Sequence, residues 1–334
     1  MPEEYLAGYV RMLGEVSATG RRPTPGELDA RRALGERAAE AGYGPRVLLA
    51  AHLAATRTAL GGPGAPDLLM AAAEQALDAF AEGYEGGRSA RREFIDDLLP
   101  GRDAPDRLAE RAARFGLRPA DAHTVAVARA PTPYADGGPP LRRLEAALAG
   151  QPVLLTVKDG HLVCVTSGEQ DGTLADFARR ASTGALVAIG RPHPGVDGIA
   201  ASYAEALGTL DVADRLGFEG PLLRAADLLV FPVLTRDRAA LADLVLTVLG
   251  PLRAGRGGAT PLLDTLTAYF DAGCVAAEAA RRLNLSVRAL TYRLERIHRL
   301  TTHDPADPAH RYTLQTATLA ARLLNWPTEP LSSV

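Results

Sequence analysis

The chain has 334 residues, of which 47% are hydrophobic and 23% are charged. This length predicts two or three domains, and the apolar content is sufficient for packed cores and excludes a largely disordered chain. The 37 lysine and arginine residues against 40 aspartate and glutamate residues give a formal net charge of −3. This balance excludes a uniformly basic protein that coats nucleic acid, but it allows a small basic region on an acidic body.

The cysteines and the N-terminus narrow the class of protein. Cys164 and Cys274 are far apart in the sequence, and neither they nor the seven histidines show the spacing of metal ligands. We therefore expect no disulfide framework, no metal and no cofactor, which fits a reducing compartment. The N-terminus lacks the order of a signal peptide, and no apolar run approaches the roughly 18–20 residues of a membrane span. These features predict a soluble, cytoplasmic protein with no membrane partner.

Residues 1–100 are predicted to form a helical bundle. Apolar residues recur at helical spacing over Tyr5–Leu13. The segment Thr24–Glu27 has the residue types of a capping box, with proline at the first helical position. Two further stretches rich in alanine and leucine complete the predicted bundle, at Arg46–Leu60 and Pro66–Tyr84.

Glycine-rich segments are predicted to interrupt these helices. Gly61–Gly64 separates the two stretches rich in alanine and leucine, and Gly83–Gly87 predicts a bend in the chain. A helical segment at Arg91–Leu99 follows and would connect the bundle to the next domain.

From about residue 120 the apolar pattern becomes that of strands alternating with helices. Strands are predicted at Thr124–Ala128, over the hairpin at residues 152–166, and at Leu186–Gly190. Helices are predicted at Leu174–Ala181, Ile199–Leu216 and Arg236–Leu249. Asp159-Gly160 supplies the turn of the hairpin. We therefore predict a mixed α/β domain over residues 101–249, followed by a flexible linker at residues 250–260.

Residues 261–326 are predicted to form an all-helical domain that contains a helix-turn-helix. Within Val275–Leu300 a short helix is followed by a turn at Asn284-Leu285, and Ser286 can then cap a second helix. Small side chains in the first helix would let the two helices approach closely. We expect the second helix, residues 286–299, to lie in the major groove of double-stranded DNA.

The second helix has an apolar face and a basic face when its residues are spaced at about 100°. Its apolar face is predicted to pack in the core and consists of Val287, Leu290, Leu294 and Ile297. The segment Glu278–Leu300 carries six arginines and two glutamates. Arginine can bind guanine edges or phosphates, and tyrosine can donate to phosphate, although arginines also cover the outside of purely structural bundles. The predicted DNA-binding residues are Ser286, Arg288, Ala289, Thr291, Tyr292, Arg293, Arg296 and Arg299.

The C-terminal region resembles the helix-turn-helix domain of the PucR/CdaR family of bacterial transcriptional regulators. The matching residues are Leu262-Leu263, Thr265-Leu266, Tyr269-Phe270, Ala279-Ala280, Leu283, Leu290, Tyr292-Arg293-Leu294, Arg296-Ile297, Asp304-Pro305, Asp307-Pro308, Arg311, Leu314 and Gln315. The family usually carries a His-x-Asn-Thr run at the start of its recognition helix. This chain has Ser286-Val287-Arg288-Ala289 there, a departure that bears on its base preference.

Two further regions extend the resemblance. Ala188–Ile199, followed by Ser202-Tyr203 and Glu205-Ala206, is similar to the GGDEF-like domain of these regulators, and the N-terminal helices are similar to the RsbRD-type domain. The resemblance implies a multi-domain α plus α/β protein. Its parts would be an N-terminal helical bundle that receives an input, a central degenerate GGDEF-like α/β domain, and a C-terminal all-α helix-turn-helix domain.

On these grounds we predict a transcriptional regulator that binds double-stranded DNA and responds to a small-molecule effector. A homodimer or higher homo-oligomer is expected, because a single helix-turn-helix gives limited affinity and two-fold symmetry pairs two half-sites. An alternative is a signalling module that binds a protein partner or small ligand through its helical and GGDEF-like domains, with a DNA head weakened by the altered Ser286–Ala289 run.

A nucleotide-forming enzyme is the third interpretation, and the sequence argues against it. The Gly-Gly-Asp/Glu-Glu-Phe signature, whose carboxylates hold metal, does not occur, and the nearest string, Gly168–Gly172, has a different order. Gly190–Gly195 lacks the lysine and hydroxyl residue that complete a P-loop. We therefore predict no enzymatic activity and no catalytic residue.

Overall fold

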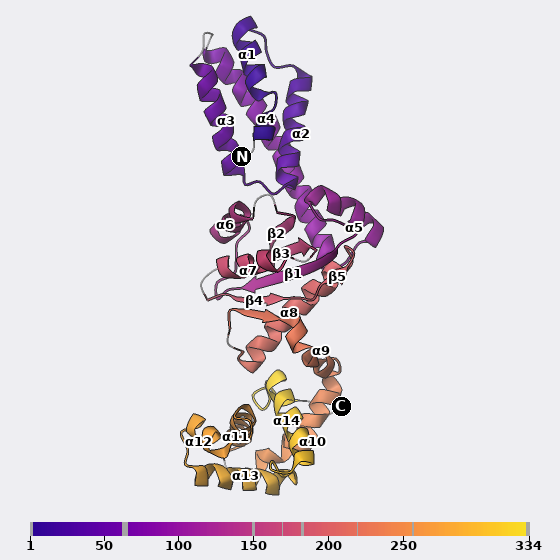
Figure 1. Cartoon of the computed structure of the whole chain (residues 1–334), viewed down its shortest axis with the longest axis vertical. Helices are drawn as coiled ribbons and strands as arrows, with labels where there is room; N and C mark the ends of the chain where they lie inside the picture. Colours follow the sequence, from indigo (N-terminus) through magenta and orange to yellow (C-terminus); the bar gives the residue numbers. More distant parts are fainter. Residues whose placement is uncertain are drawn as a thin grey trace. The chain divides into compact units, whose positions relative to one another are not determined.

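The computed structural model describes residues 3–61, 66–148, 151–168, 170–181, 184–218, 220–255 and 257–331. The chain forms two compact units, Met1–Leu210 with Gly220–Ala226 and Asp211–Glu219 with Asp227–Val334 (Figure 1). Each unit is described by itself below. Three predicted segments, the break at Gly61–Gly64, the string Gly168–Gly172 and the linker 250–260, contain residues that lie outside the described ones.

The N-terminal part of the first unit is a helical bundle, as predicted. Its elements are η1 (Glu3–Leu6), α1 (Tyr9–Thr19), α2 (Pro25–Glu40), α3 (Pro45–Leu60) and α4 (Pro66–Leu98). One cluster of buried side chains, around Leu13 and Leu69, joins α1 to α4. A second cluster, around Leu34 and Leu48, joins α2 to α3. The amphipathic pattern of these helices is therefore satisfied within the bundle.

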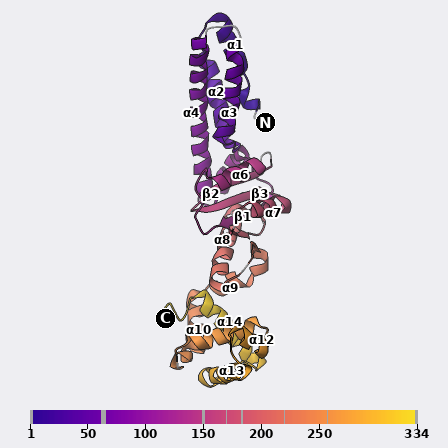
Figure 2. The same cartoon turned by 90° about the vertical axis from the view of Figure 1, so that its left-hand side faces the viewer.

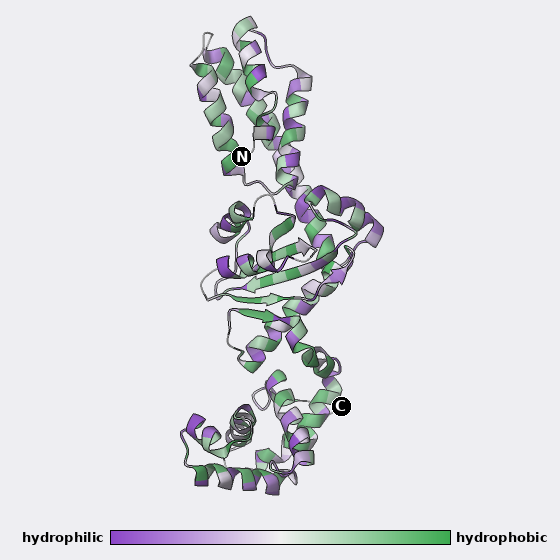
Figure 3. Cartoon of the chain, viewed as in Figure 1, coloured by the Kyte–Doolittle hydropathy of each residue, from purple (hydrophilic) through white to green (hydrophobic). Residues whose placement is uncertain are grey.

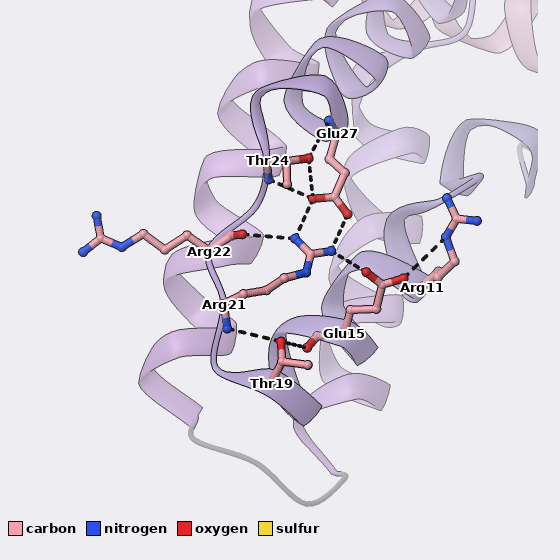
Figure 4. A network of polar contacts seen from close by, with 7 residues as sticks. All are labelled: Arg11, Glu15, Thr19, Arg21, Arg22, Thr24 and Glu27. Atoms are coloured by element: carbon pink, nitrogen blue, oxygen red, sulfur yellow. Dashed lines mark hydrogen bonds and ion pairs between the residues drawn. The ribbon is translucent and has the colours of Figure 1, made fainter.

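The start of α2 confirms the predicted capping box. Thr24 Oγ1 accepts a hydrogen bond from the backbone N–H of Glu27 at 3.3 Å, and the Glu27 carboxylate accepts one from the backbone N–H of Thr24 at 2.8 Å. Arg21 binds both Glu27 and Glu15, which joins the start of α2 to α1 (Figure 4). The hydrogen bonds from Arg21 lower the pKa of Glu27 to about 2.

The predicted bend at Gly83–Gly87 is wrong, because α4 continues through it as one helix (Figure 2). The glycines allow close packing of two helices. A Cβ atom on Gly83 would lie 1.9 Å from the carbonyl oxygen of Arg32 in α2, and one on Gly87 would lie 2.6 Å from that of Glu36. Only glycine leaves room for α2 to pack this closely against α4. The contact between the two helices offsets the destabilising effect of glycine within a helix.

The rest of the first unit is an α/β domain built on one sheet. Its strands are β1 (Ala122–Arg129), β2 (Val153–Lys158), β3 (His161–Ser167), β4 (Leu186–Ile189), β5 (His193–Pro194) and β6 (Leu222–Arg224). Their order is β2-β3-β1-β4-β6, with β5 also paired to β1. Only the β4–β6 pair is parallel among these strands. The predicted hairpin joins β2 to β3, and Asp159 and Gly160 have the positive φ angles, 49° and 75°, that a tight hairpin turn requires.

Helices cover both faces of this sheet, because successive residues of a strand point to opposite sides. Val125 and Val127 of β1 belong to a core shared with the end of α4, α5 and α8, whereas Ala126 and Ala128 belong to a core shared with α6 and α7. These elements are α5 (Pro105–Ala112), η2 (Ala113–Phe115), α6 (Pro139–Ala147), α7 (Asp171–Arg180) and α8 (Gly198–Leu216). Figure 3 shows the strands as largely hydrophobic, as expected of a sheet buried on both faces.

The second unit is helical throughout its described residues after β6. Its elements are η3 (Ala225–Leu228) at its border, α9 (Val230–Thr235), α10 (Arg238–Leu249), η4 (Gly250–Ala254), α11 (Thr260–Asp271), α12 (Ala276–Arg282), α13 (Val287–Thr301) and α14 (Pro308–Leu323). Leu249 of α10 shares one core with Leu266 and Leu314. The segment expected to be a flexible linker includes η4, whose Leu252 is fully buried in that core. No helix of the described residues is both long and apolar enough to cross a membrane.

Candidate nucleic-acid interface

The helix-turn-helix expected from the spacing is present in α12 and α13. Its turn is a Schellman motif, in which the backbone N–H of Leu285 donates to the carbonyl of Ala280 at 2.8 Å and that of Asn284 donates to Arg281 at 3.1 Å. Asn284 has a φ of 52°, a left-handed conformation that asparagine tolerates better than most residues. Backbone hydrogen bonds therefore fix the connection between the two helices.

Small side chains hold the two helices close together, as the sequence predicted. Ala279 and Ala280 of α12 are buried with Leu290 of α13 and Tyr269 of α11 in one cluster. Ser286 caps α13, because its Oγ accepts the backbone N–H of Ala289 at 3.1 Å. The predicted capping residue is thus confirmed, and its hydroxyl is engaged in the cap.

One residue of the predicted apolar face does not lie in the core. Leu290 and Ile297 are fully buried and Leu294 is half-buried, but Val287 is 49% exposed. Val287 is the first residue of α13. A helical wheel gives the direction of a side chain around its helix, but it does not show how far the neighbouring helices extend. The wheel therefore did not predict that Val287, in the first turn of α13, is exposed.

The opposite face of α13 is open to solvent. Arg288, Thr291 and Arg299 are exposed, Tyr292 is 58% exposed, and Arg296 is half-buried. These positions follow the helical repeat, so their side chains lie along one side of the helix. The face therefore presents guanidinium groups and a phenol, the groups that bind base edges and phosphates, together with one carboxylate, that of the exposed Glu295.

Ion pairs separate the arginines of this region into two groups. Arg281 and Arg282 of α12 both bind Glu278, at 2.6 and 3.0 Å, and these bonds lower the pKa of Glu278, with Arg282 the larger cause. No carboxylate of the described residues lies within ion-pair distance of the guanidinium groups of α13. The positive charge of α12 is partly neutralised, whereas that of α13 is available to a polyanion.

Besides Ser286, two more of the predicted DNA-binding side chains already have partners within the protein. Arg293 Nη1 donates to Thr265 Oγ1 of α11 at 3.3 Å, and Thr291 Oγ1 donates to the carbonyl of Val287 at 3.0 Å. The first contact holds α13 against α11. Thr291 uses its hydroxyl proton within its own helix, as threonine often does at this spacing.

A shallow hollow of about 530 Å³ lies beside the start of α13. Six of the predicted DNA-binding residues line it: Ser286, Arg288, Ala289, Tyr292, Arg293 and Arg296. The start of α11, at Pro261 and Leu262, forms its other wall. The structure therefore brings these six residues together, while Thr291 and Arg299 lie outside the hollow on the same helix.

The glycine-rich segment after β4 forms a strand-to-helix turn, as the sequence indicated. A Cβ atom on Gly190 would lie 2.0 Å from the carbonyl oxygen of Ser202, so this glycine allows the close approach of α8. The Glu205 carboxylate accepts hydrogen bonds from the backbone N–H of Arg191 at 2.8 Å and from His193 Nε2 at 3.1 Å. Protein groups therefore occupy the polar atoms that a phosphate would need.

Other candidate centres are buried or dispersed. Cys164 is fully buried, and burial raises the pKa of its thiol to about 12, whereas Cys274 is half-buried. Among the described residues, histidine, cysteine, aspartate and glutamate form no cluster of three or more that could hold a metal ion. Sequence reasoning did not identify one unusual pair, Arg31 and His52, which are both buried in the helical bundle.

Two regions of the chain match known protein families. Residues 101–212 match the GGDEF-like domain, and residues 262–320 match the PucR C-terminal helix-turn-helix domain. The second match covers α12, α13 and most of α11 and α14, and it includes the open face of α13 and most residues of the hollow.

Individual proteins also resemble the chain. Uncharacterized proteins of Mycobacterium tuberculosis and Mycobacterium bovis are each 32% identical over 272 residues, which cover 76% of this chain and 63% of theirs. The chain thus spans less than two thirds of the length of these relatives. A crystal structure of a regulator of polyketide synthase expression from Bifidobacterium adolescentis is 22% identical, with a TM-score of 0.37, over 71% of this chain and 94% of the other.

Proposed function

We infer from the two matched domains that the chain belongs to the PucR/CdaR family, and from that premise we propose that it is a sequence-specific DNA-binding transcriptional regulator. The observation that carries this proposal is the open face of α13, whose arginines have no ion-pair partner among the described residues. An exposed helix with free guanidinium groups on a helix-turn-helix is suited to the major groove of DNA. We propose that residues 286–299, which comprise the cap residue Ser286 and most of α13, form the recognition helix.

The contacts of each side chain suggest its role in binding. We assign base readout to Arg288 and Tyr292, which are exposed and line the hollow, with Ala289 of the same lining as an apolar contact. Arg296 and the exposed Arg299 lie further along the helix and are assigned to phosphates. Ser286, Thr291 and Arg293 contribute chiefly by holding the helix, because their polar groups already bond within the protein.

The remaining parts of the chain receive supporting roles in this proposal. The helical bundle, residues 1–100, would receive an effector, and the GGDEF-like domain over 101–249 would relay the signal or mediate self-association without catalysis. The DNA-binding domain is placed at 261–326. Because α10 and η4 pack with the C-terminal helices, we move residues 238–249 from the predicted GGDEF-like domain to this body, and we do not treat η4 as a free linker.

A homodimer follows from the need for two half-sites, and the bundle offers a surface for it. The outer face of α3 carries exposed Leu49 and Leu53, and the helix has arginines but no acidic residue. The outer face of α4 carries the exposed acidic residues Glu74, Asp78 and Glu85. We assign α3 of one copy to contact α4 of a second copy, because apolar and charged groups are then complementary. Leu53→Glu should convert the dimer to monomer in light scattering, and an unchanged mass would exclude this surface.

Footprinting of the full chain on its neighbouring promoter region tests the proposed function. A protected site with two half-sites about one helical turn apart, or a multiple of it, is the expected result. Binding should also weaken steeply with salt, since phosphate contacts release counterions. The Ser286–Ala289 run favours a second candidate, a signalling module with a weakened DNA head. No protected site, together with a stable complex with a protein partner, would favour that candidate.

A further inference from the structure

The open face of α13 carries one acidic residue among its basic ones. Glu295 is exposed, and it lies on the same helix as Arg288, Tyr292 and Arg299. A negative charge on a surface that binds DNA is unfavourable, because the phosphates of both strands repel it. The roles of the arginines in binding DNA do not explain a carboxylate at this position.

Glu295 lies near the centre of the open face and not at its edge. It follows Arg288 by seven residues, which at about 100° per residue places the two side chains within about 20° of each other around the helix axis. On the same scale Tyr292 is about 40° from Arg288 on one side, and Thr291 is about 60° from it on the other. Both are exposed, and Glu295 falls between them. A groove of DNA that contacts Arg288 and Tyr292 therefore also faces Glu295.

The carboxylate of Glu295 is not engaged within the protein. Among the described residues, no arginine or lysine lies within ion-pair distance of this carboxylate, and it accepts no hydrogen bond. Arg299 follows four residues later, a spacing at which glutamate and a basic residue can pair on a helix. In α12 this spacing is used, since Glu278 binds Arg282 at 3.0 Å. The carboxylate of Glu295, unlike that of Glu278, is thus available to an external donor.

The bases of DNA differ in what they offer a carboxylate in the major groove. Guanine presents the acceptors N7 and O6, and thymine presents the acceptor O4 and a methyl group. Cytosine presents the N4 amino group, which is a donor, whereas in adenine the N6 amino group lies beside the acceptor N7. An ionised carboxylate can only accept hydrogen bonds. It is therefore best matched to cytosine, and it is repelled by the acceptors of guanine and thymine.

We propose that Glu295 is a specificity-determining residue that selects cytosine in the operator. Its carboxylate accepts a hydrogen bond from cytosine N4 in the major groove, and this bond offsets the repulsion by the phosphates. On other sequences the repulsion is not offset, so Glu295 weakens binding to DNA that lacks the operator. The inference deepens the proposed function and rests on it, because α13 must lie in the major groove.

The helix between Arg288 and Glu295 sets the distance between the bases that the two residues read. Seven residues of α-helix span about 10.5 Å, which corresponds to about three base pairs of about 3.4 Å along a groove that the helix follows. Homeodomain recognition helices likewise contact bases over about seven residues. Arginine favours guanine, so the expected half-site contains a guanine and, about three base pairs away, a cytosine.

Selection from a library of random double-stranded DNA by the full chain tests this inference. The parent should enrich a motif with cytosine at the expected position. Glu295→Ala should lose the base preference at this position and keep it at the others. Glu295→Gln should change the preference from cytosine to adenine, because glutamine binds adenine N6 and N7. Since the Glu295 side chain is exposed and unpaired, both variants should keep the circular dichroism and the unfolding temperature of the parent.

Binding constants for single duplexes measure the size of the effect. When thymine replaces the cytosine of the enriched duplex, binding should weaken at least about tenfold for the parent but less than about twofold for Glu295→Ala. On a duplex that lacks the motif, Glu295→Ala should bind about two- to fivefold more tightly than the parent. Asp243→Asn is the matched control, since it removes one negative charge at an exposed site of α10. It should select the motif of the parent and bind it equally well.

The outcomes separate this inference from the proposed function. If both Glu295 variants select the same motif as the parent, the inference is overturned and DNA binding by α13 stands. A uniform gain of affinity on all duplexes, without a change of motif, would also overturn it, because Glu295 would then act through its charge alone. If the parent enriches no sequence, the proposed function itself fails, and the inference fails with it.

Discussion

The arginines of the helical bundle and those of α13 differ in what they bind. In the bundle Arg21 is held by Glu15 and Glu27, Arg32 by Asp29 and Glu82, and Arg31 is buried against aromatic rings. On α13 the exposed guanidinium groups have no such partner among the described residues. In a chain whose positive residues are almost all arginine, the presence of arginine therefore indicates little. The ion pairs that each arginine makes within the protein show which arginines are available to an external anion.

Reversing the charge of the unpaired arginines is expected to have the largest effect. The double variant Arg288→Glu, Arg296→Glu should weaken operator binding by more than about a hundredfold, because each contact is worth roughly 1–3 kcal/mol and the new carboxylates repel phosphate. Fluorescence anisotropy with operator DNA measures this. The control Arg11→Glu changes an exposed arginine of the bundle and should bind as the parent does. Equal binding by parent and double variant would show that α13 does not face DNA.

A pair of glycine substitutions tests whether α4 and α2 pack as closely as the structure indicates. Gly83→Ala should destabilise the bundle by about 1–3 kcal/mol, since its Cβ would overlap the backbone of Arg32. Gly86→Ala lies in the same helix with open space around it and should stabilise the protein by up to about 1 kcal/mol. Urea unfolding monitored by circular dichroism measures both. Equal effects at the two positions would contradict the close contact.

Two single alanine substitutions on α13 test which arginine contacts bases and which contacts phosphates. Arg288→Ala should cost about 1–3 kcal/mol in operator binding and relax the base preference at one position. Arg299→Ala should weaken binding similarly for all sequences and reduce the slope of affinity against salt by about one. Binding to a set of single-base operator variants at several salt concentrations separates the two effects. The same sequence profile for both variants would show that the roles are misassigned.

Removing the ion pair between Arg21 and Glu27 in the bundle is expected to have the smallest effect on stability, and this effect should depend on pH. The pKa of Glu27 is lowered from 4.5 to about 2, so the stability that its ion pair contributes is complete above about pH 4.5 and is lost as the pH falls towards 2. Glu27→Gln should therefore be less stable than the parent at pH 7, and the difference should shrink between pH 4.5 and 2. Thermal unfolding across this range measures the difference. A gap that does not depend on pH would mean that the carboxylate charge contributes nothing.

The features that were predicted correctly depend on residues close together in the sequence, whereas the features that were missed depend on distant helices. The capping box at Thr24, the Asp159-Gly160 turn and the Ser286 cap depend on residues three positions apart or fewer, so local chemistry was sufficient to predict them. Gly83–Gly87 was misassigned because the reason for its glycines lies in α2, far away in the sequence. The exposure of Val287 was missed for a related cause, since it depends on where other helices end.

The basic face of α13 was predicted as a set of residue types, but its internal contacts were not. Nothing in the spacing indicates that Arg293 donates to Thr265 or that Glu278 holds Arg281 and Arg282. For Arg31 a signal was present and was not used. It lies three, four and seven residues before Leu34, Gly35 and Ala38, on the buried stripe of α2, where a charged residue is unexpected.

The sequence by itself determined the order of the helices and strands, the local caps and turns, and the matches to the GGDEF-like and PucR helix-turn-helix domains. These properties depend on residue types at short spacing, where side chains and backbone of the same segment interact directly. Only the tertiary structure decided which arginines are paired, which glycines allow helices to touch, and that Arg31 and His52 are buried in the helical bundle. These features depend on contacts between segments far apart in the chain. Patterns of nearby residues do not indicate which distant segments will meet.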